Sequence, residues 1–307
     1  MVWLTAERKV LRLADRRCAA EGEMTEPTQI NNQTGRPATD ERIRLAHGGG
    51  GVLMNRLIVE HLLPVLDNEF LRSLGDGAVL PPAEGNPVLT IDAFVVQPLE
   101  FPGGDIGRLA VCGTVNDLAM MGARPVALAL AMVLEEGLPI AVLDRVTASI
   151  SSAAQEAEVC VVTGDTKVID PAGRGSPGMF VTTAGLGICP EGLRLGPERI
   201  SPGDRVLING PIAEHGLAVM SAREGLQFET QLSSDAAPLA GLVQRLLRCG
   251  PAVKFLRDPT RGGLAGVLAD IAEQTGLTVE IQEPAIPISR ATRHAAEMLG
   301  LDPLNVA

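Results

Sequence analysis

The stretch Val161-Val162-Thr163-Gly164-Asp165-Thr166-Lys167-Val168 joins an apolar run to three consecutive polar residues. The β-branched residues predict a buried strand, and the glycine marks a place where the backbone turns or where another group approaches it closely. Asp165, Thr166 and Lys167 then fall at the expected strand end, where α/β folds collect binding groups. Asp can bind a hard cation, Thr can donate to a phosphate oxygen, and Lys supplies a compact positive charge. The alternative is a turn that carries a solvated ion pair.

The composition is that of a folded globular protein. Of the 307 residues, 46% are hydrophobic and 21% are charged, which suits two domains of ordinary size or one large one. The net charge of −11 and an aromatic content of 2% argue against a nucleic-acid partner. Five cysteines without a C-x-x-C pair indicate a reduced, cytoplasmic protein. The longest apolar run is too short to cross a membrane, which takes roughly 20 residues.

A glycine run follows a polar N-terminal segment. Residues 1–42 lack clear periodicity, which predicts a disordered tail. The run His47-Gly48-Gly49-Gly50-Gly51 comes next and opens onto a helical pattern. A loop whose backbone N–H groups hold phosphate fits it, although the Gly-Lys-Ser/Thr ending of a Walker loop is missing. A flexible connector remains the alternative for the glycines, and a structural role remains the alternative for His47.

Acidic residues interrupt two apolar patterns. Asp92 lies in a strand predicted over residues 87–96, where its carboxylate is costly unless a cation or a backbone donor pairs with it. Asn116 and Asp117 break the apolar face of a helix predicted over residues 105–121. Such oxygen donors indicate a cation site, and a polar helix edge is the alternative.

The remaining pattern alternates between strands and helices, which predicts an α/β fold. The other predicted strands cover residues 126–134, 161–168, 179–188, 205–210 and 277–282, and the other predicted helices cover 140–157, 215–222, 236–247, 264–273 and 289–299. A second unit begins near residue 200, so we expect domains over 43–195 and 196–307. Before the helix at 264–273, Asp258, Arg261 and two glycines suit anion binding at a helix N-terminus.

These motifs together resemble the HypE family of hydrogenase maturation factors. The resemblance runs from about Leu45 to Ala307, in order and at family spacing, and rests on residues 47–51, the Asp92 strand, 102–107, 116–117, 134–139, 164–168 and 258–263. It implies the PurM-like fold of aminoimidazole ribonucleotide synthetase. In that fold an N-terminal domain dimerises through its sheet, and a C-terminal α/β domain closes over an ATP site.

The resemblance also implies an activity. HypE proteins take part in [NiFe] hydrogenase maturation: they use ATP to dehydrate a carbamoyl group on their own C-terminal cysteine to a thiocyanate, which supplies cyanide to the iron. The implied partners are a second copy of the chain, the carbamoyltransferase HypF and the HypC–HypD iron carrier. The implied cofactors are ATP and Mg²⁺.

Residue roles follow from the same resemblance. It implies that Mg²⁺ is held by Asp92, Asp117 and Asp165. Nucleotide contacts are implied for Gly48, Gly49, Gly50, Gly51, Asn116, Gly164, Thr166 and Lys167. The residues implied to act at the reacting end are His47, Lys167, Asp258 and Arg261.

This sequence departs from the family pattern at its end. HypE chains continue with an Asn-Glu-Gly-Lys motif and finish in Pro-Arg-Ile-Cys, and neither is present before Ala307. Two expectations follow: the sequence is a fragment, or the natural protein has lost the reaction in cis. A shortened C-terminal domain would leave an unpaired sheet edge. The rival functions are a non-catalytic nucleotide-binding scaffold and another enzyme of this fold, such as thiamine-monophosphate kinase.

Overall fold

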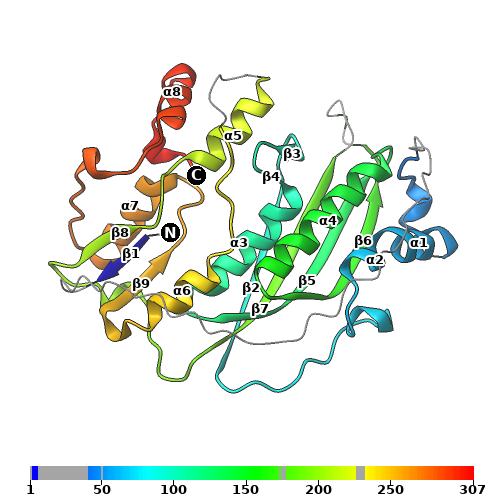
Figure 1. The fold of residues 1–307 in the computed structure, drawn as a ribbon, viewed down its shortest axis with the longest axis horizontal. Helices are drawn as coiled ribbons and strands as arrows, with labels where there is room; N and C mark the ends of the chain where they lie inside the picture. Colours follow the sequence, from blue (N-terminus) through cyan, green and yellow to red (C-terminus); the bar gives the residue numbers. More distant parts are fainter. Residues whose placement is uncertain (1, 6–40, 50, 172, 174–177, 226–231) are drawn as a thin grey trace, which may run out of the picture.

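The computed structural model describes residues 2–5, 41–49, 51–171, 173, 178–225 and 232–307. They form a larger sheet in the order β2-β7-β5-β6 and a smaller one in the order β8-β1-β9, which lie on opposite sides of the molecule (Figure 1). Helices pack against both sheets, so the predicted α/β class is confirmed.

The larger sheet combines one parallel strand pair with two antiparallel ones. Its strands are β2 (Asn86–Phe94), β5 (Arg124–Glu135), β6 (Cys160–Ile169) and β7 (Met179–Cys189). β5 and β6 are parallel and are joined through α4 (Ile140–Glu156), whereas β7 pairs antiparallel with both β5 and β2. This order places β2 and β6 at opposite edges of the sheet.

Helix α3 (Ile106–Met120) lies across one face of this sheet, beside α4 (Figure 1). It begins at Asp105, whose carboxylate accepts a hydrogen bond from the backbone N–H of Arg108 and so caps the helix. The opposite face of the sheet keeps apolar side chains exposed: Leu89 is 75% exposed and Ile91 is 69% exposed. Strand alternation therefore gives the sheet one buried face and one apolar face that is open in this chain.

Short helical segments cover the β6 edge. They are η1 (Leu45–His47), α1 (Val52–Leu57), the π-helical segment η2 (Ile58–Leu62), α2 (Leu63–Leu66) and η3 (Leu71–Ser73). The hairpin of β3 (Glu100–Phe101) and β4 (Gly104–Asp105) leads into α3.

The C-terminal half is built around β8 (Arg205–Ile208) and β9 (Val253–Arg257). Its helices are α5 (Glu214–Arg223), α6 (Ala240–Leu247), α7 (Gly263–Thr275) and α8 (Arg290–Leu299), and its 3-10 turns are η4 (Pro197–Arg199), η5 (Gly250–Ala252), η6 (Glu283–Ala285) and η7 (Pro303–Asn305). α6 packs on α3, and its Ala240 and Val243 belong to the hydrophobic core of the N-terminal half. The two halves therefore share packing across the expected boundary.

Two of the wrong sequence predictions concern the C-terminal half and the strand that joins its sheet. Val2–Thr5, within the predicted disordered tail 1–42, form strand β1, which pairs antiparallel with both β8 and β9 (Figure 1). Because β1 lies between β8 and β9, its backbone N–H and C=O groups find hydrogen-bond partners on both neighbouring strands. The average composition of residues 1–42 does not reveal such a short strand. Residues 6–40 lie outside the described part of the chain. Residues 277–282 form no strand: they line a cavity of about 1030 Å³ together with β8, and they have no ladder partner there.

The backbone does not turn at Gly164, because β6 runs through it to Ile169. The alternative of close approach is correct: a Cβ at Gly164 would lie 2.6 Å from the carbonyl oxygen of Leu130 on β5. The predicted strand end at Asp165 was therefore wrong, because β6 remains paired with β5 beyond that residue.

Replacing Gly164 by Ala should lower the free energy of unfolding by roughly 1–3 kcal/mol, because β5 and β6 must separate to admit the methyl group. Urea unfolding monitored by circular dichroism measures this change. Gly77→Ala is the matched control, since a Cβ there meets nothing within 4 Å. Equal stability of the two variants would contradict the close approach.

Candidate functional site

Asp165, Thr166 and Lys167 of β6 form an ion pair and a backbone hydrogen bond that share one oxygen. Lys167 Nζ lies 2.9 Å from Asp165 Oδ1, and the backbone N–H of Thr166 donates to the same oxygen at 2.8 Å. The hydrogen bond from Lys167 is the main reason that the pKa of Asp165 is lowered. Both charged side chains are more than half exposed, so the pair is weakly held and its members can turn to a ligand.

The glycine loop lies against the same strand. A Cβ at Gly48 would be 2.6 Å from the backbone nitrogen of Val168, so only glycine allows this approach. Gly49 follows it, Gly50 lies outside the described residues, and Gly51 has a φ of 79° where α1 begins. The glycine run and the Asp-Thr-Lys segment, for both of which the resemblance implies nucleotide contacts, therefore lie next to each other in the fold.

His47 has a structural environment. Its side chain is 8% exposed, and its Nδ1 accepts a hydrogen bond from the backbone N–H of Arg44 at 2.9 Å. This contact closes the turn that leads into the glycine loop. The structure favours the structural alternative for His47 over the expected catalytic role, because the ring is packed beneath the loop.

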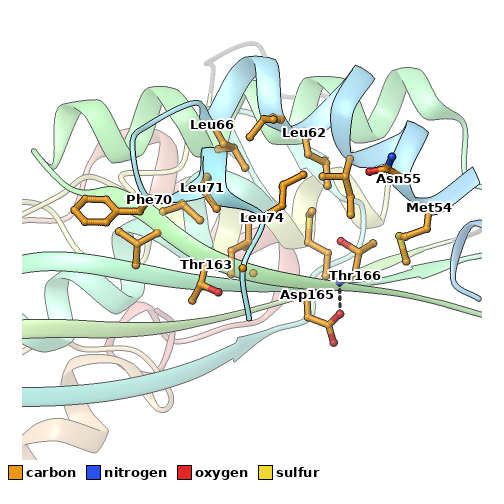
Figure 2. A pocket seen from close by; sticks show the side chains of 18 of the residues that line it. Met54, Asn55, Leu62, Leu66, Phe70, Leu71, Leu74, Thr163, Asp165 and Thr166 are labelled. Carbon is orange, nitrogen blue, oxygen red and sulfur yellow. Dashed lines mark hydrogen bonds between the residues drawn. The ribbon is translucent and has the colours of Figure 1, made fainter. Parts of the chain in front are cut away.

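A cavity of about 380 Å³ separates β6 from the helical segments that cover it (Figure 2). Its apolar lining includes Met54, Leu62, Leu66, Phe70, Leu71 and Leu74. Thr166 points into the cavity, whereas the carboxylate of Asp165 points to the other side of the strand (Figure 2). The β6 edge thus offers an apolar recess beside a charged pair.

A second group of acids gathers where α3 meets the C-terminal half. It consists of Asp92 on β2, Asp117 on α3 and Asp258 directly after β9. Burial, followed by the charge of Asp258, raises the pKa of Asp117 to about 6, although Thr90 Oγ1 donates to its carboxylate at 3.0 Å. Burial also raises the pKa of Asp258, with a contribution from the charge of Asp92. This is a partly buried, electrostatically coupled carboxylate cluster.

Asp165 lies far from that cluster within one chain. Register pairs Asp92 with Thr183, Thr183 with Leu130 and Leu130 with Gly164. Three strand spacings put Asp92 and Gly164 roughly 14 Å apart. Oxygen ligands bind Mg²⁺ at about 2.1 Å, so the expected single site of Asp92, Asp117 and Asp165 is wrong for one chain.

The acidic cluster consists of carboxylates, and carboxylate oxygens are the type of ligand that a hard cation takes. No three His, Cys, Asp or Glu residues among those described lie close enough to hold a metal by themselves. Asp92 Oδ1 accepts a hydrogen bond from the backbone N–H of Ala93 at 2.8 Å. This oxygen is therefore paired with a backbone donor, one of the two partners expected for the Asp92 carboxylate.

Two other expected site residues have different surroundings. The side-chain amide of Asn116 donates to the carbonyl oxygen of Ala237 at 3.0 Å and accepts from the N–H of Leu239 at 2.7 Å. One N–H of the Asn116 amide and one lone pair of its oxygen are thus used within the protein, and the expected nucleotide contact of Asn116 stays a prediction. Arg261, three residues beyond Asp258, is exposed. The helix predicted over 236–247 was wrong at its start: α6 begins at Ala240, and residues 236–239 are irregular because their backbone groups bond to α3 instead.

Comparison with known proteins identifies the family. Residues 74–189 match the model "AIR synthase related protein, N-terminal domain", and residues 201–306 match "AIR synthase related protein, C-terminal domain". The carbamoyl dehydratase HypE of Azotobacter vinelandii is 48% identical over 265 residues, covering 86% of this chain and 77% of that protein. The chain belongs to the HypE family. The predicted family and PurM-like fold are thereby confirmed.

Solved structures agree with this family. HypE in complex with ATP superposes with a TM-score of 0.81 at 43% identity, covering 86% of this chain and 78% of that one. HypE from a HypE–HypF complex gives a TM-score of 0.69 at 46% identity, covering 84% and 81%. Thiamine-monophosphate kinase from Stenotrophomonas maltophilia superposes with a TM-score of 0.60 at 22% identity, covering 84% of this chain and 83% of that one. At this identity the likeness shows a shared fold alone. Among the described helices of this HypE-family chain, none is long and apolar enough to cross a membrane.

Asp117→Asn should stabilise the metal-free protein at pH 8 but hardly at pH 4. The pKa of Asp117 in the folded protein, about 6, lies above its ordinary value of 3.8. Stability from the protonated acid is thus complete below about pH 4 and is lost as pH rises through 6. Allowing for partial exposure, we expect a gain of roughly 1–2 kcal/mol at pH 8.

Chemical unfolding in EDTA at the two pH values measures this effect. Asp76→Asn, in an exposed loop, is the control and should change little at either pH. A gain of the same size at both pH values would show that charge burial at Asp117 is not its cause.

Proposed function

We propose that this chain is an ATP-dependent carbamoyl dehydratase acting in [NiFe] hydrogenase maturation. The observation that carries the proposal is the packing of the glycine loop against β6 beside Asp165, Thr166 and Lys167. In the proposed reaction, ATP phosphorylates the oxygen of a cysteine-bound carboxamide, and phosphate then leaves while the amide nitrogen gives up both protons. The products are a thiocyanate, ADP and phosphate. Names of HypE-family relatives and the solved ATP complex support this assignment.

The β6 edge supplies groups suited to a nucleotide. Lys167 can neutralise phosphate charge, and Asp165, freed from its ion pair, can hold a cation bound to that phosphate. The N–H of Gly48 donates to the carbonyl oxygen of Leu45 at 2.9 Å. The phosphate donors that we propose from this loop are therefore the backbone N–H groups of Gly49 and Gly51. The apolar cavity beside Thr166 has the size and lining for the base of ATP.

We propose Mg²⁺ as the cation. Phosphoryl transfer depends on positioning and on charge neutralisation, and Mg²⁺ supplies the latter when bound with phosphate. We propose Asp165 as the cation ligand at the β6 edge. Asp92, Asp117 and Asp258 are the proposed ligands at the acidic cluster. A cation would also relieve the repulsion within the buried acidic cluster.

We propose that two copies combine these separate places. The open sheet face carries Leu89, Ile91 and the 64% exposed Val95, an apolar surface of the kind that mediates association. A two-fold pairing of such faces would bring the β6 edge of one copy toward the β2 edge of the other. The homodimer would then join the Asp165 group of one chain to the Asp258 group of the second.

HypF is the proposed source of the carbamoyl group, supported by the solved HypE–HypF complex. The HypC–HypD iron carrier is the proposed acceptor of cyanide, and the cytoplasm is the proposed compartment.

Co-elution with purified HypF on size exclusion tests the first partner. Turnover of free thiamine phosphate would instead support the kinase alternative, and nucleotide binding without turnover of a carbamoylated cysteine peptide would support the scaffold.

Asp165→Ala should weaken Mg-ATP binding at least tenfold, about 1.4 kcal/mol, because the variant loses a cation ligand. Isothermal titration calorimetry measures the affinity. Asp170→Ala, just beyond the same strand, is the control and should bind like the parent chain. Unchanged affinity of Asp165→Ala would show that Asp165 does not take part in Mg-ATP binding. Equal affinities of the parent chain for ATP and for tripolyphosphate would show that the cavity does not bind the base.

Mixed dimers test whether the site is shared between chains. Asp165→Ala and Asp258→Asn should each bind Mg-ATP weakly alone. After dissociation and reassociation together, roughly a quarter of the sites should regain parental affinity, because half of the dimers are mixed and each holds one intact combination. No recovery in dimers would place each site within one chain, and a monomer at micromolar concentration by light scattering would contradict the homodimer.

A further inference from the structure

An irregular segment, residues 232–239, connects the hydrophobic cores of the two halves; we name it the strap. Leu232 is buried in the cluster formed by α5, α8 and the last residues of the chain. At the other end, Leu239 packs against the core of the N-terminal half, and α6 begins directly after it. The strap has no helix or strand, so its peptide groups depend on partners from other elements.

One face of α3 supplies several of these partners. The amide of Asn116 bonds both Ala237 and Leu239, as described above. Two turns earlier on the same face, Arg108 donates from Nε to the carbonyl oxygen of Ala236 at 2.9 Å. Because a single Asn116 side chain pairs with two peptide groups, its loss leaves both without their partners.

The turn before α3 holds the start of the strap. The N–H of Ser234 donates to the carbonyl oxygen of Pro102 at 2.8 Å. Gly103 has a φ of 88°, and a Cβ there would lie 2.6 Å from the Ser234 nitrogen, so this approach requires glycine. From the C-terminal half, His215 Nδ1 lies 2.9 Å from Ser234 Oγ. The strap is thus bonded to both halves.

The strap contacts α3 at the residue next to the acidic cluster. Asp117 follows Asn116, and Asp258 reaches the same region from the end of β9 in the C-terminal half. Their like charges oppose this approach. Packing of α6 and of β9 residues Val253 and Leu256 on the N-terminal core, together with the hydrogen bonds of the strap, opposes this repulsion.

We infer that Asn116 is a positioning residue of the proposed ATP-dependent reaction. By fastening the strap to α3, it keeps the carboxylate of Asp117 in its place near Asp258, where the proposed cation would be held. The inference rests on the proposed function, and it gives Asn116 a role other than the direct nucleotide contact expected from the sequence.

Asn116→Ala tests the inference in the 307-residue chain with Mg-ATP as the probe. Hydrogen exchange of the strap amides should accelerate at least tenfold, because two of its peptide groups lose their partners. The Mg²⁺ concentration needed for half-maximal ATP binding should rise about fivefold, and saturating Mg²⁺ should restore ATP affinity to within about twofold, since excess cation offsets misplaced ligands. Asn116→Asp, which keeps the acceptor for Leu239, should show a smaller change in both measurements.

Gln244→Ala is the matched control. Gln244 on α6 donates to the carbonyl oxygen of Gly122 at 3.3 Å, so it also bonds the two halves but does not touch the strap. It should alter neither strap exchange nor the Mg²⁺ requirement. Lost ATP affinity that Mg²⁺ does not restore, with strap exchange unchanged, would make Asn116 a direct ligand and overturn the inference. Faster exchange with an unchanged Mg²⁺ requirement would also overturn it. A parent chain that fails to bind Mg-ATP would overturn the proposed function itself, and the inference with it.

Discussion

The position of α3 is the constraint on which the rest of the structure depends. The helix packs on β2 and β7, on α4, and on α6 from the other half of the chain. Small residues make this possible: a Cβ at Gly107 would lie 2.6 Å from the carbonyl oxygen of Val146, and one at Gly113 would lie 2.8 Å from the ring of Phe94. Because it is enclosed on several sides, α3 fixes the relation between the larger sheet and the C-terminal half.

This enclosure explains why polar residues of α3 have different surroundings. Asn116 faces the strap and bonds its backbone, whereas Asp117 accepts from Thr90 and faces the acidic cluster. Adjacent residues of a helix point about 100° apart, so one turn of α3 serves a structural contact and an electrostatic one. The cost of burying Asp117 is visible in its raised pKa. A cation with bound phosphate would reduce that cost, which links the packing of the helix to the proposed chemistry.

The two charged places differ in what they contribute. The β6 edge is exposed, with a lysine that neutralises its acid and a recess beside it. The acidic cluster is more buried and carries excess negative charge. The β6 edge has one lysine and one carboxylate, whereas the acidic cluster has three carboxylates under the influence of Arg257. A shared site between two copies would combine them, and the apolar open face of the sheet provides a surface for that pairing.

Much of this protein was determined by its sequence alone. The order of motifs indicated the family, and periodicity located α3, α4 and the strands of the larger sheet, because apolar spacing reports which face of an element is buried. The family resemblance also implied that Thr166, Lys167 and the glycine loop contact the same nucleotide, and the fold places this loop against β6. Only the tertiary structure decided that Asp92 and Asp165 lie at opposite edges, because strand order in a sheet does not follow chain order. It also decided that Asn116 bonds residues more than a hundred positions away. Contacts between distant segments depend on packing of the whole fold, and local periodicity carries no information about them.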